Sequence, residues 1–368
     1  MLKKYKAKHI VMCELILLLI FSSVLVKQDI DQEATMYASM YDTEKKYIKW
    51  VSFDVNQKAL DQAYRYDVET KDKDVHLNWI ELLAYLGARY GGDFSRYKEK
   101  NMTELANKLI SKEETMNELT KDMKYYDYYL EAYSAVLGGM VGEYEIEVKD
   151  EAAPGGKRME EKYGLKAFLP IAKFYPYSHF DDFGVSRSYG FKRKHLGHDM
   201  MGQVGTPIIA TESGYIEALG WNKYGGWRIG IRSFDSKRYY YYAHLRQNFP
   251  YNKALEIGSV VQAGDVIGYL GRTGYSNKEN ANNIRTPHLH FGIQLIFDES
   301  QKESVSEIWI DCYDLILFLY KNRCETVKNT ETKEYYRVYE FIDPVAQDYI
   351  KHQIYDYDDE NIGIHIYD

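Results

Sequence analysis

The chain has few cysteines and no excess of basic residues. Only 3 of its 368 residues are cysteine, and one of them, Cys13, falls in an apolar run near the N-terminus. The other two, Cys312 and Cys324, can form at most one disulfide, which excludes a small fold stapled by several disulfides and leaves their pairing open. The net charge is −8. A general nucleic-acid-binding protein is therefore excluded, because its binding surface would be basic.

Long hydrophobic runs are absent, apart from one at the N-terminus. Residues 10–26 read IVMCELILLLIFSSVLV and follow a lysine-rich flank, residues 1–9. A basic flank before an apolar run is typical of a signal peptide or a signal anchor. The run is short for a span and is interrupted by Glu14, but no small-residue cleavage site follows it. We expect an uncleaved single-pass membrane anchor with residues 30–368 outside the cytoplasm; the alternative is a cleaved signal peptide and a secreted protein.

The segment after this run has the apolar spacing of helices. The stretch NWIELLAYLGARYGG predicts a helix that begins after the N-cap Asn78 and ends at Gly91. Ser111 and Glu114 predict the capping box of a second helix, and YYDYYLEAYSAVLGG predicts a third. No cluster of ligand-type residues occurs here. The simplest interpretation is a helical spacer or a module that binds another envelope protein.

The pattern changes after residue 164. Short β-prone runs such as TPIIA, WRIGIRS and RYYYYAHL are separated by turn residues, which indicates an antiparallel sheet, sandwich or partly closed barrel. The predicted fold class is α+β: a helical N-terminal region, a mostly antiparallel β-sheet domain and a C-terminal helical extension. The expected segments are 30–148 (helical domain), 149–164 (linker), 165–297 (β-rich domain), 298–345 (helical extension) and 346–368 (acidic tail).

Candidate metal ligands occupy separate segments of the β-rich region. They are His195 and Asp199 in KHLGHD, His244 in YYYYAHL, and His288 and His290 in PHLHFG. Residues two apart in a strand point to one side, so His288 and His290 should face one surface together. By the same rule Tyr240, Tyr242 and His244 should share a side. Gly197 interrupts the first pair, which we place on a loop entering a strand.

Each of these residues has an ordinary alternative role. His195 and Asp199 alone would more often be a polar surface pair, and His244 alone a hydrogen-bonded core histidine. Their joint occurrence favours a metal site, because a catalytic zinc takes three protein ligands and keeps one position for water. Two of the five residues would then remain to accept a proton or to stabilise an oxyanion. The residues alone do not say which two.

The same region resembles the lysostaphin-type, or LytM-type, zinc endopeptidases of bacterial cell-wall metabolism. The resemblance covers residues 165–297 and rests on HLGHD, GTPIIATESGYIEALGW, YYYYAHL, GDVIGYLGRTG and PHLHFGI, in the family's order. It implies a mostly antiparallel β-sheet groove of the duplicated-hybrid-motif kind and cleavage of peptide bonds in peptidoglycan stems or cross-bridges. It further implies the roles of the five residues: one zinc ion held by His195, Asp199 and His290, with His244 and His288 as the catalytic pair.

The sequence departs from the family pattern at two places. The stretch YSNKENANNIRT, residues 275–286, lengthens the link before the HxH strand and is expected to form a loop at the groove rim. His198 stands where the family often has an aliphatic residue, and we interpret it as a supporting or surface residue. Gly197 is expected to give the loop the backbone freedom that lets both nearby ligands reach one ion.

Two classes of function fit these features. The first is an active zinc endopeptidase that is anchored in the membrane and acts on peptidoglycan. The second is a catalytically silent scaffold or activator that uses the groove to bind partners in envelope remodelling or sporulation. Family members that take the second route lose metal ligands, whereas this sequence retains all five residues. The sequence therefore favours the enzyme.

Overall fold

The computed structural model describes residues 47–188, 192–302 and 306–362 of the chain. The predicted basic flank and apolar run, residues 1–26, lie outside the described residues. Among the helices that the structure does describe, none is both long and apolar enough to cross a membrane. Residues 52–368 form one compact unit, and the boundaries predicted inside it stay a prediction.

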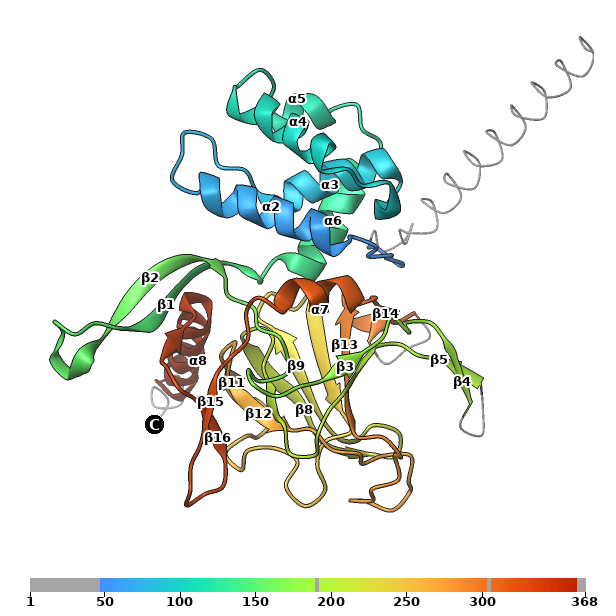
Figure 1. The fold of residues 1–368 in the computed structure, drawn as a ribbon, viewed down its shortest axis with the longest axis vertical. Helices are drawn as coiled ribbons and strands as arrows, with labels where there is room; N and C mark the ends of the chain where they lie inside the picture. The colour runs from blue at the N-terminus through green and yellow to red at the C-terminus, as the bar shows by residue number, and fades with distance from the viewer. Residues whose placement is uncertain (1–46, 189–191, 303–305, 363–368) are drawn as a thin grey trace, which may run out of the picture. The chain divides into compact units, whose positions relative to one another are not determined.

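The first part of this unit is helical, as expected (Figure 1). The helix predicted after Asn78 is confirmed: the Asn78 side chain accepts from the backbone N–H groups of Ile80 and Glu81, and Gly91 ends the helix with φ 65°. The third predicted helix is also confirmed. The helices are α2 (Gln57–Thr70), α3 (Trp79–Tyr90), η1 (Phe94–Arg96), α4 (Glu99–Ile110), α5 (Met116–Thr120) and α6 (Tyr126–Leu137).

The start predicted for the second helix is wrong. Ser111 is the C-cap of α4 and is followed by Lys112 in the left-handed region, at φ 58°. The capping box is instead formed by Thr115 and Glu118, at the start of α5. The sequence offers both pairs with the same spacing. The chain uses the second, since Ser111 and Lys112 end α4 and the next helix begins only after Thr115.

The segment predicted as a linker, residues 149–164, is the turn and second strand of a β-hairpin. β1 (Val141–Lys149) pairs with β2 (Lys157–Leu165) along its whole length, and β17 (Phe341–Ile342) joins the other edge of β1. η2 (Pro154–Gly156) makes the turn, with both of its glycines at positive φ. Both strands are half-exposed and carry many charges, so they lack the alternation of apolar residues that indicates a strand.

The prediction of a mostly antiparallel sheet is confirmed. An eight-stranded sheet has the order β11-β8-β9-β10-β13-β6-β3, with β14 paired to β13. Its strands are β3 (Ser178–His179), β6 (His198–Met201), β8 (Gly214–Asn222), β9 (Gly226–Ser233), β10 (Arg238–Ala243), β11 (Val260–Val261), β13 (His288–Leu295) and β14 (Ile308–Trp309). Two short pairs flank it: β4 (Ser186–Ser188) with β5 (Lys192–Lys194), and β7 (Pro207–Ile209) with β12 (Val266–Tyr269).

The central strands of this sheet separate a core face from a second, polar face. On β13, Leu289, Phe291 and Ile293 are fully buried, whereas His288 and His290 lie on the opposite side and keep some exposure. Phe291 contacts the buried rings of Tyr240 and Tyr242 on the neighbouring strand. The alternation predicted from the sequence therefore places the HxH pair on one surface, away from the core.

The segment after residue 298 is only partly helical, which corrects the predicted helical extension. The predicted extension contains β14, which extends the main sheet, and the short α7 (Tyr313–Leu319). β15 (Thr326–Lys328) and β16 (Tyr335–Arg337) form a hairpin. The difference arises because Ile308 and Trp309 pair with Leu295 and Gln294 of β13, a contact with a distant part of the chain. Cys312 and Cys324 are both buried and free, so no disulfide joins them.

The predicted acidic tail is helical over most of its length. α8 (Pro344–Ile362) begins at a proline, and the backbone N–H of Val345 donates to the Asp343 carboxylate. A capping aspartate followed by proline in the first turn is a helix start signal. The acidic tail was predicted from amino-acid composition alone. Composition does not reveal a helix start, which depends on the order of the residues.

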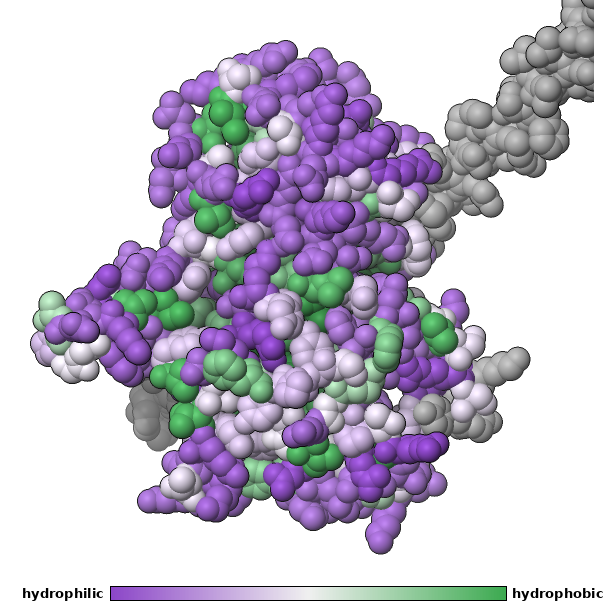
Figure 2. All heavy atoms as spheres, viewed as in Figure 1, coloured by the Kyte–Doolittle hydropathy of each residue, from purple (hydrophilic) through white to green (hydrophobic). Residues whose placement is uncertain are grey.

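The helical part and the sheet are in direct contact. The buried Arg238 on β10 donates to the backbone oxygen of Ala135 on α6 at 2.7 Å. α7 lies between the two parts: its Phe318 ring stacks on Trp79 of α3, and Asp314 accepts from the backbone of Gln57. In the view of Figure 2 the helical part shows mostly hydrophilic side chains, with apolar ones in small separate groups. Most apolar residues of the helical part are buried inside it.

Candidate metal centre and active site

Two histidines and an aspartate from separate segments converge on the polar face of the main sheet. The ligand-type atoms of His195, Asp199 and His290 all lie within 4.8 Å of one another. His195 Nε2 is 3.0 Å from Asp199 Oδ1 and 3.1 Å from His290 Nδ1, which is itself 2.8 Å from the same carboxylate oxygen. All three residues are among those singled out from the sequence.

Strand register brings two of these residues side by side. Asp199 on β6 pairs directly with His290 on β13, so their side chains project from the same face. His195 lies in the loop just before β6, which agrees with the prediction of a loop entering a strand. The loop must pass very close to β13 for its histidine to reach the pair.

Gly197 allows this close passage, for a reason other than the one expected. Its backbone is not among the positive-φ glycines, so the predicted need for unusual freedom is wrong. A Cβ atom at this position would instead lie 2.6 Å from His290 Cε1 and 2.8 Å from the backbone oxygen of Phe291. Glycine is required because the loop lies directly against β13.

Backbone carbonyl groups fix the orientation of the surrounding imidazoles. His195 Nδ1 lies 3.2 Å from the Asp182 oxygen, His244 Nδ1 2.9 Å from the Thr273 oxygen, and His288 Nδ1 2.8 Å from the Thr286 oxygen. A carbonyl oxygen can only accept, so each Nδ1 carries the proton in these contacts. Each Nε2 then presents its lone pair toward the centre of the site, which is the arrangement of metal-binding and proton-accepting histidines.

His244 reaches the site through an unusual backbone conformation. It follows β10 directly and has φ 62°, in the left-handed region. Its ring lies 4.8 Å from that of His288 and 5.8 Å from that of His290, whereas Tyr242 points into the core. The prediction that His244 shares a side with Tyr240 and Tyr242 is therefore wrong. The chain turns at this residue and reverses its side chain.

The site favours neutral imidazoles beside an ionised carboxylate. Burial lowers the pKa of His244 well below its ordinary value, and the neighbouring His288 adds to the effect. Burial also lowers the pKa of His290, against the opposing influence of Asp199. For Asp199, burial would raise the pKa, but its close contacts with His195 and His290 hold it far below its usual range. Neutral nitrogen and anionic oxygen are the forms that bind a divalent cation.

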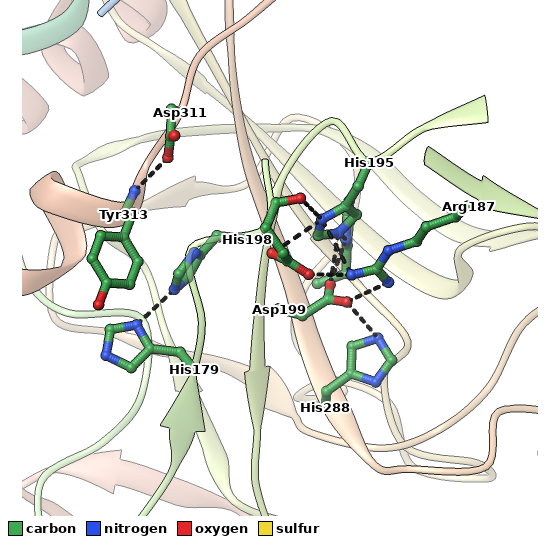
Figure 3. A network of polar contacts seen from close by, with 10 residues as sticks. His179, Arg187, His195, His198, Asp199, His288, Asp311 and Tyr313 are labelled. Carbon is green, nitrogen blue, oxygen red and sulfur yellow. Dashed lines mark hydrogen bonds and ion pairs between the residues drawn. The ribbon is translucent and has the colours of Figure 1, made fainter. Parts of the chain in front are cut away.

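An arginine that the sequence did not single out also belongs to this cluster. Arg187, on β4, donates through Nη1 to the second oxygen of Asp199 at 2.7 Å, and its other nitrogen contacts Asp182 (Figure 3). One carboxylate oxygen of Asp199 is thereby held by arginine, while the other faces the histidines. No residue spacing pointed to Arg187, because its role depends on a contact with Asp199, 12 residues further along the chain.

A small cavity of about 70 Å³ opens onto these groups. Four histidines line it, His195, His244, His288 and His290, so the structure brings both predicted helper residues to the predicted ligands. The remaining lining residues are Arg187, Arg193, Tyr224, Gly225, Tyr241 and Tyr275. Tyr275 begins the lengthened loop, residues 275–286, which therefore borders the cavity as expected.

His198 lies outside the cluster. It neighbours Asp199 in sequence but points to the other side of β6, where its Nε2 is 2.8 Å from His179 Nδ1 (Figure 3). The ring of Tyr313 packs 5.3 Å from that of His179. Burial lowers the pKa of His198 to about 3, with His179 contributing. The interpretation as a surface residue is wrong, since His198 is almost fully buried.

Comparison with known proteins identifies the family of this region. Residues 193–304 match the sequence profile of Peptidase family M23. The chain therefore carries a peptidase M23 domain, and the resemblance to lysostaphin-type and LytM-type endopeptidases is confirmed.

Individual relatives align with the same part of the chain. An L-Ala–D-Glu endopeptidase of Bacillus subtilis (strain 168) is 40% identical over 131 residues, which are 35% of this chain and 38% of the relative. Lysostaphin of Staphylococcus staphylolyticus is 40% identical over 98 residues, 26% of this chain and 18% of lysostaphin. The chain thus spans well under half the length of either relative.

Among solved structures, the catalytic domain of lysostaphin from Staphylococcus simulans aligns with 38% of this chain and 92% of its own length. The two are 31% identical, and the TM-score is 0.29.

Proposed function

We propose that this protein is a zinc endopeptidase that hydrolyses peptide bonds in peptidoglycan stems or cross-bridges. The convergence of His195, Asp199 and His290 on one point, with His244 and His288 beside them, carries the proposal. Family membership agrees with it, because relatives of the M23 domain include peptidoglycan endopeptidases by name.

The donor set fits zinc. Two imidazole nitrogens and one carboxylate oxygen are a common catalytic zinc set, with bond lengths of about 2.0–2.2 Å and a further position kept for water. The three donor atoms are close enough to share one such ion. His195 and Asp199 are also held from behind by Asp182 and Arg187, as metal ligands usually are. A zinc ion bound here would activate water for attack on a peptide carbonyl and polarise that carbonyl.

His288 and His244 are the proposed catalytic pair. Their Nδ1 atoms are tied to backbone carbonyls, so both Nε2 atoms are free of their own protons and face the ligand cluster. One can accept the proton of the attacking water, and the other, once protonated, can donate to the developing oxyanion. The low pKa that burial gives His244 keeps it neutral before reaction.

A peptidoglycan digest tests this function directly. The full chain, purified in detergent, is incubated with peptidoglycan, and released fragments are followed by mass spectrometry with chelator and after zinc is restored. We expect cleavage that chelator abolishes and zinc recovers, and the new termini name the bond. Absence of cleavage by zinc-loaded protein, across several peptidoglycan types, would contradict the enzyme and favour the alternative of a silent scaffold.

Location and partners extend this proposal. We infer that residues 10–26 form a single-pass membrane anchor and that the rest of the chain faces the cell wall, where its substrate lies. A cleaved signal peptide and a secreted enzyme remain the alternative. Mass spectrometry of the N-terminus of the native protein separates the two. Residues 30–148 are the proposed contact for an envelope protein partner.

A further inference from the structure

A second cavity is separate from the metal centre and is lined by residues of β3 and α7 and their flanks. Its volume is about 440 Å³, within the range of about 300–1,000 Å³ that is usual for small-molecule sites. The lining residues are Pro176, Tyr177, His179, Leu317, Tyr320 and Arg323. They lie before and after residues 193–304, the part that matches the M23 family. The family match therefore assigns no role to this cavity.

Arg323 brings a positive charge to this cavity that neutral groups hold in place. Its Nη2 donates to the backbone oxygens of Ala172 at 2.7 Å and Tyr175 at 2.9 Å. Among the described residues, its buried Nε has no hydrogen-bond partner and the side chain forms no ion pair. Four other buried or half-buried arginines each contact a carboxylate: Arg187, Arg232, Arg238 and Arg337. Because a half-buried charge is costly without a counter-charge, Arg323 is suited to an anionic ligand.

Two tyrosine rings orient this guanidinium and give the cavity flat apolar walls. The guanidinium carbon of Arg323 lies 5.3 Å from the ring centre of Tyr320 and 5.7 Å from that of Tyr177. A guanidinium stacked on rings keeps N–H groups at its edge, where a phosphate or carboxylate can accept two of them. Tyr320 is 57% exposed, so its ring can be reached from solvent. Among the described residues neither phenol hydroxyl has a hydrogen-bond partner, so both can bind hydroxyl groups of a ligand.

His179 adds a second polar group to the cavity lining. Its Nδ1 is 2.8 Å from His198 Nε2, and its own Nε2 has no hydrogen-bond partner among the described residues (Figure 3). When Nδ1 accepts from His198, the proton of His179 lies on Nε2 and can be donated to a ligand oxygen. The His198 side chain points away from the metal centre, so a ligand beside His179 does not occupy the place of the substrate.

We propose that this cavity binds an anionic saccharide, a sugar ring that carries a phosphate or a carboxylate. Arg323 binds the anion, and the C–H face of the sugar packs on the tyrosine rings. The phenol hydroxyls and His179 Nε2 bind the sugar hydroxyls. A purely apolar ligand would leave these polar groups and the charge of Arg323 unmatched, whereas a bare inorganic anion would leave the rings uncovered. The site goes beyond the proposed endopeptidase function and does not depend on it.

Calorimetric titration of the zinc-loaded full chain tests the site with four probes: glucose 6-phosphate, glucuronate, glucose and inorganic phosphate. We expect at least one of the first two to bind about 10-fold or more tightly than glucose and inorganic phosphate, because only these two combine the anion with the ring. Their relative affinities tell which anion the site prefers. Because anions can also reach the metal centre, only binding that Arg323→Gln removes is counted.

Variants of two lining residues separate the charge from the ring. Arg323→Gln should weaken binding of the anionic sugar by about 10- to 100-fold, the range of hydrogen bonds to a charged group. Arg285→Gln is the matched control, because Arg285 is exposed and is not part of this lining, and it should bind as the wild type does. Tyr320→Ala removes an exposed ring, so it leaves folding intact and should lower the affinity for the anionic sugar toward that for inorganic phosphate. Thermal unfolding shows that each variant is folded.

The outcomes that overturn the site are distinct. Binding of the anionic sugars that is unchanged in Arg323→Gln would reject the arginine as the anion site. Inorganic phosphate that binds as tightly as both anionic sugars would reject the saccharide, as would full affinity in Tyr320→Ala. Peptidoglycan hydrolysis is measured in parallel and should be unchanged in Arg323→Gln, because the cavity is separate from the metal centre.

Discussion

Neighbouring residues on β6 enter two different histidine clusters on opposite faces of the sheet. Asp199 joins His195 and His290 on the polar face, whereas His198 pairs with His179 on the buried face. Both clusters bring imidazole nitrogens within about 3 Å of one another. Only the first contains a carboxylate, and only the first opens onto a cavity shared with further histidines.

The difference shows what distinguishes a metal centre from a buried histidine pair. In the His179–His198 pair one ring donates to the other, so the contact needs no cation, and burial keeps His198 neutral. In the other cluster Asp199 supplies the negative charge that a divalent cation requires. Proximity of histidines is therefore a weaker sign of a metal than a shared carboxylate. The following variants test this distinction, from the largest expected effect to the smallest.

Removal of a proposed ligand should have the largest effect. His290→Ala deletes one of the three donors, so we expect loss of bound zinc and a fall of peptidoglycan hydrolysis to background. Metal content by mass spectrometry and fragment release measure the two. A His290→Ala protein that keeps one zinc per chain and full activity would show that the cluster is not the metal centre.

Removal of a proposed helper should separate metal binding from catalysis. His288→Ala leaves His195, Asp199 and His290 in place, so zinc content should be unchanged. The rate should fall by about 10²–10⁴-fold, the usual contribution of a positioned acid or base. Turnover on a defined stem peptide, alongside zinc content, tests this. Undiminished hydrolysis would reject the catalytic role of His288.

The close passage of the loop should be sensitive to a single methyl group. Gly197→Ala places a Cβ 2.6 Å from His290, so one of the two must shift. Displacement of a ligand is expected to weaken zinc binding by about 10- to 100-fold, as loss of an orienting contact does. Zinc affinity from chelator competition measures the change. Gly142→Ala is a control for added bulk, because a Cβ there meets only the Lys166 side chain, at 3.4 Å, and its φ is not positive. Normal zinc affinity in Gly197→Ala would contradict the explanation.

The buried histidine pair should matter for stability and not for metal. His198→Leu removes the partner of His179, and an unsatisfied half-buried polar group costs about 1–3 kcal/mol. We expect a lower free energy of unfolding, measured in urea, with unchanged zinc content. If His198→Leu released zinc, the two faces of β6 would not be independent.

Local sequence signals predicted part of the fold well. Asn78 and Gly91 bound α3 as expected, because a cap and a left-handed glycine act on their own neighbours. The hairpin of β1 and β2 and the strand β14 were missed, since their strands are defined by partners distant in the chain and carry little apolar alternation. The start of α5 was misplaced because two capping pairs have equal spacing, and the chain uses the second.

The candidate site, like the fold, could be predicted from the sequence only in part. All five candidate residues could be chosen from the sequence, because their types and spacings are chemically unusual. The side of the sheet on which His244 lies could not be predicted from the sequence, since it depends on one backbone angle. Arg187 could not be chosen either, because an arginine shows its role only through the carboxylate that it contacts.

The sequence by itself determined the kinds of side chain at the centre and the β-rich segment that carries them. Residue identity and alternation are properties of the chain alone, so the candidate metal ligands and the HxH surface follow from them. The tertiary structure decided which groups meet: the register of β6 on β13, the contact of Gly197 with β13, and the arginines that border the cavity. Those contacts join residues up to about a hundred positions apart, and only the packed sheet brings them together.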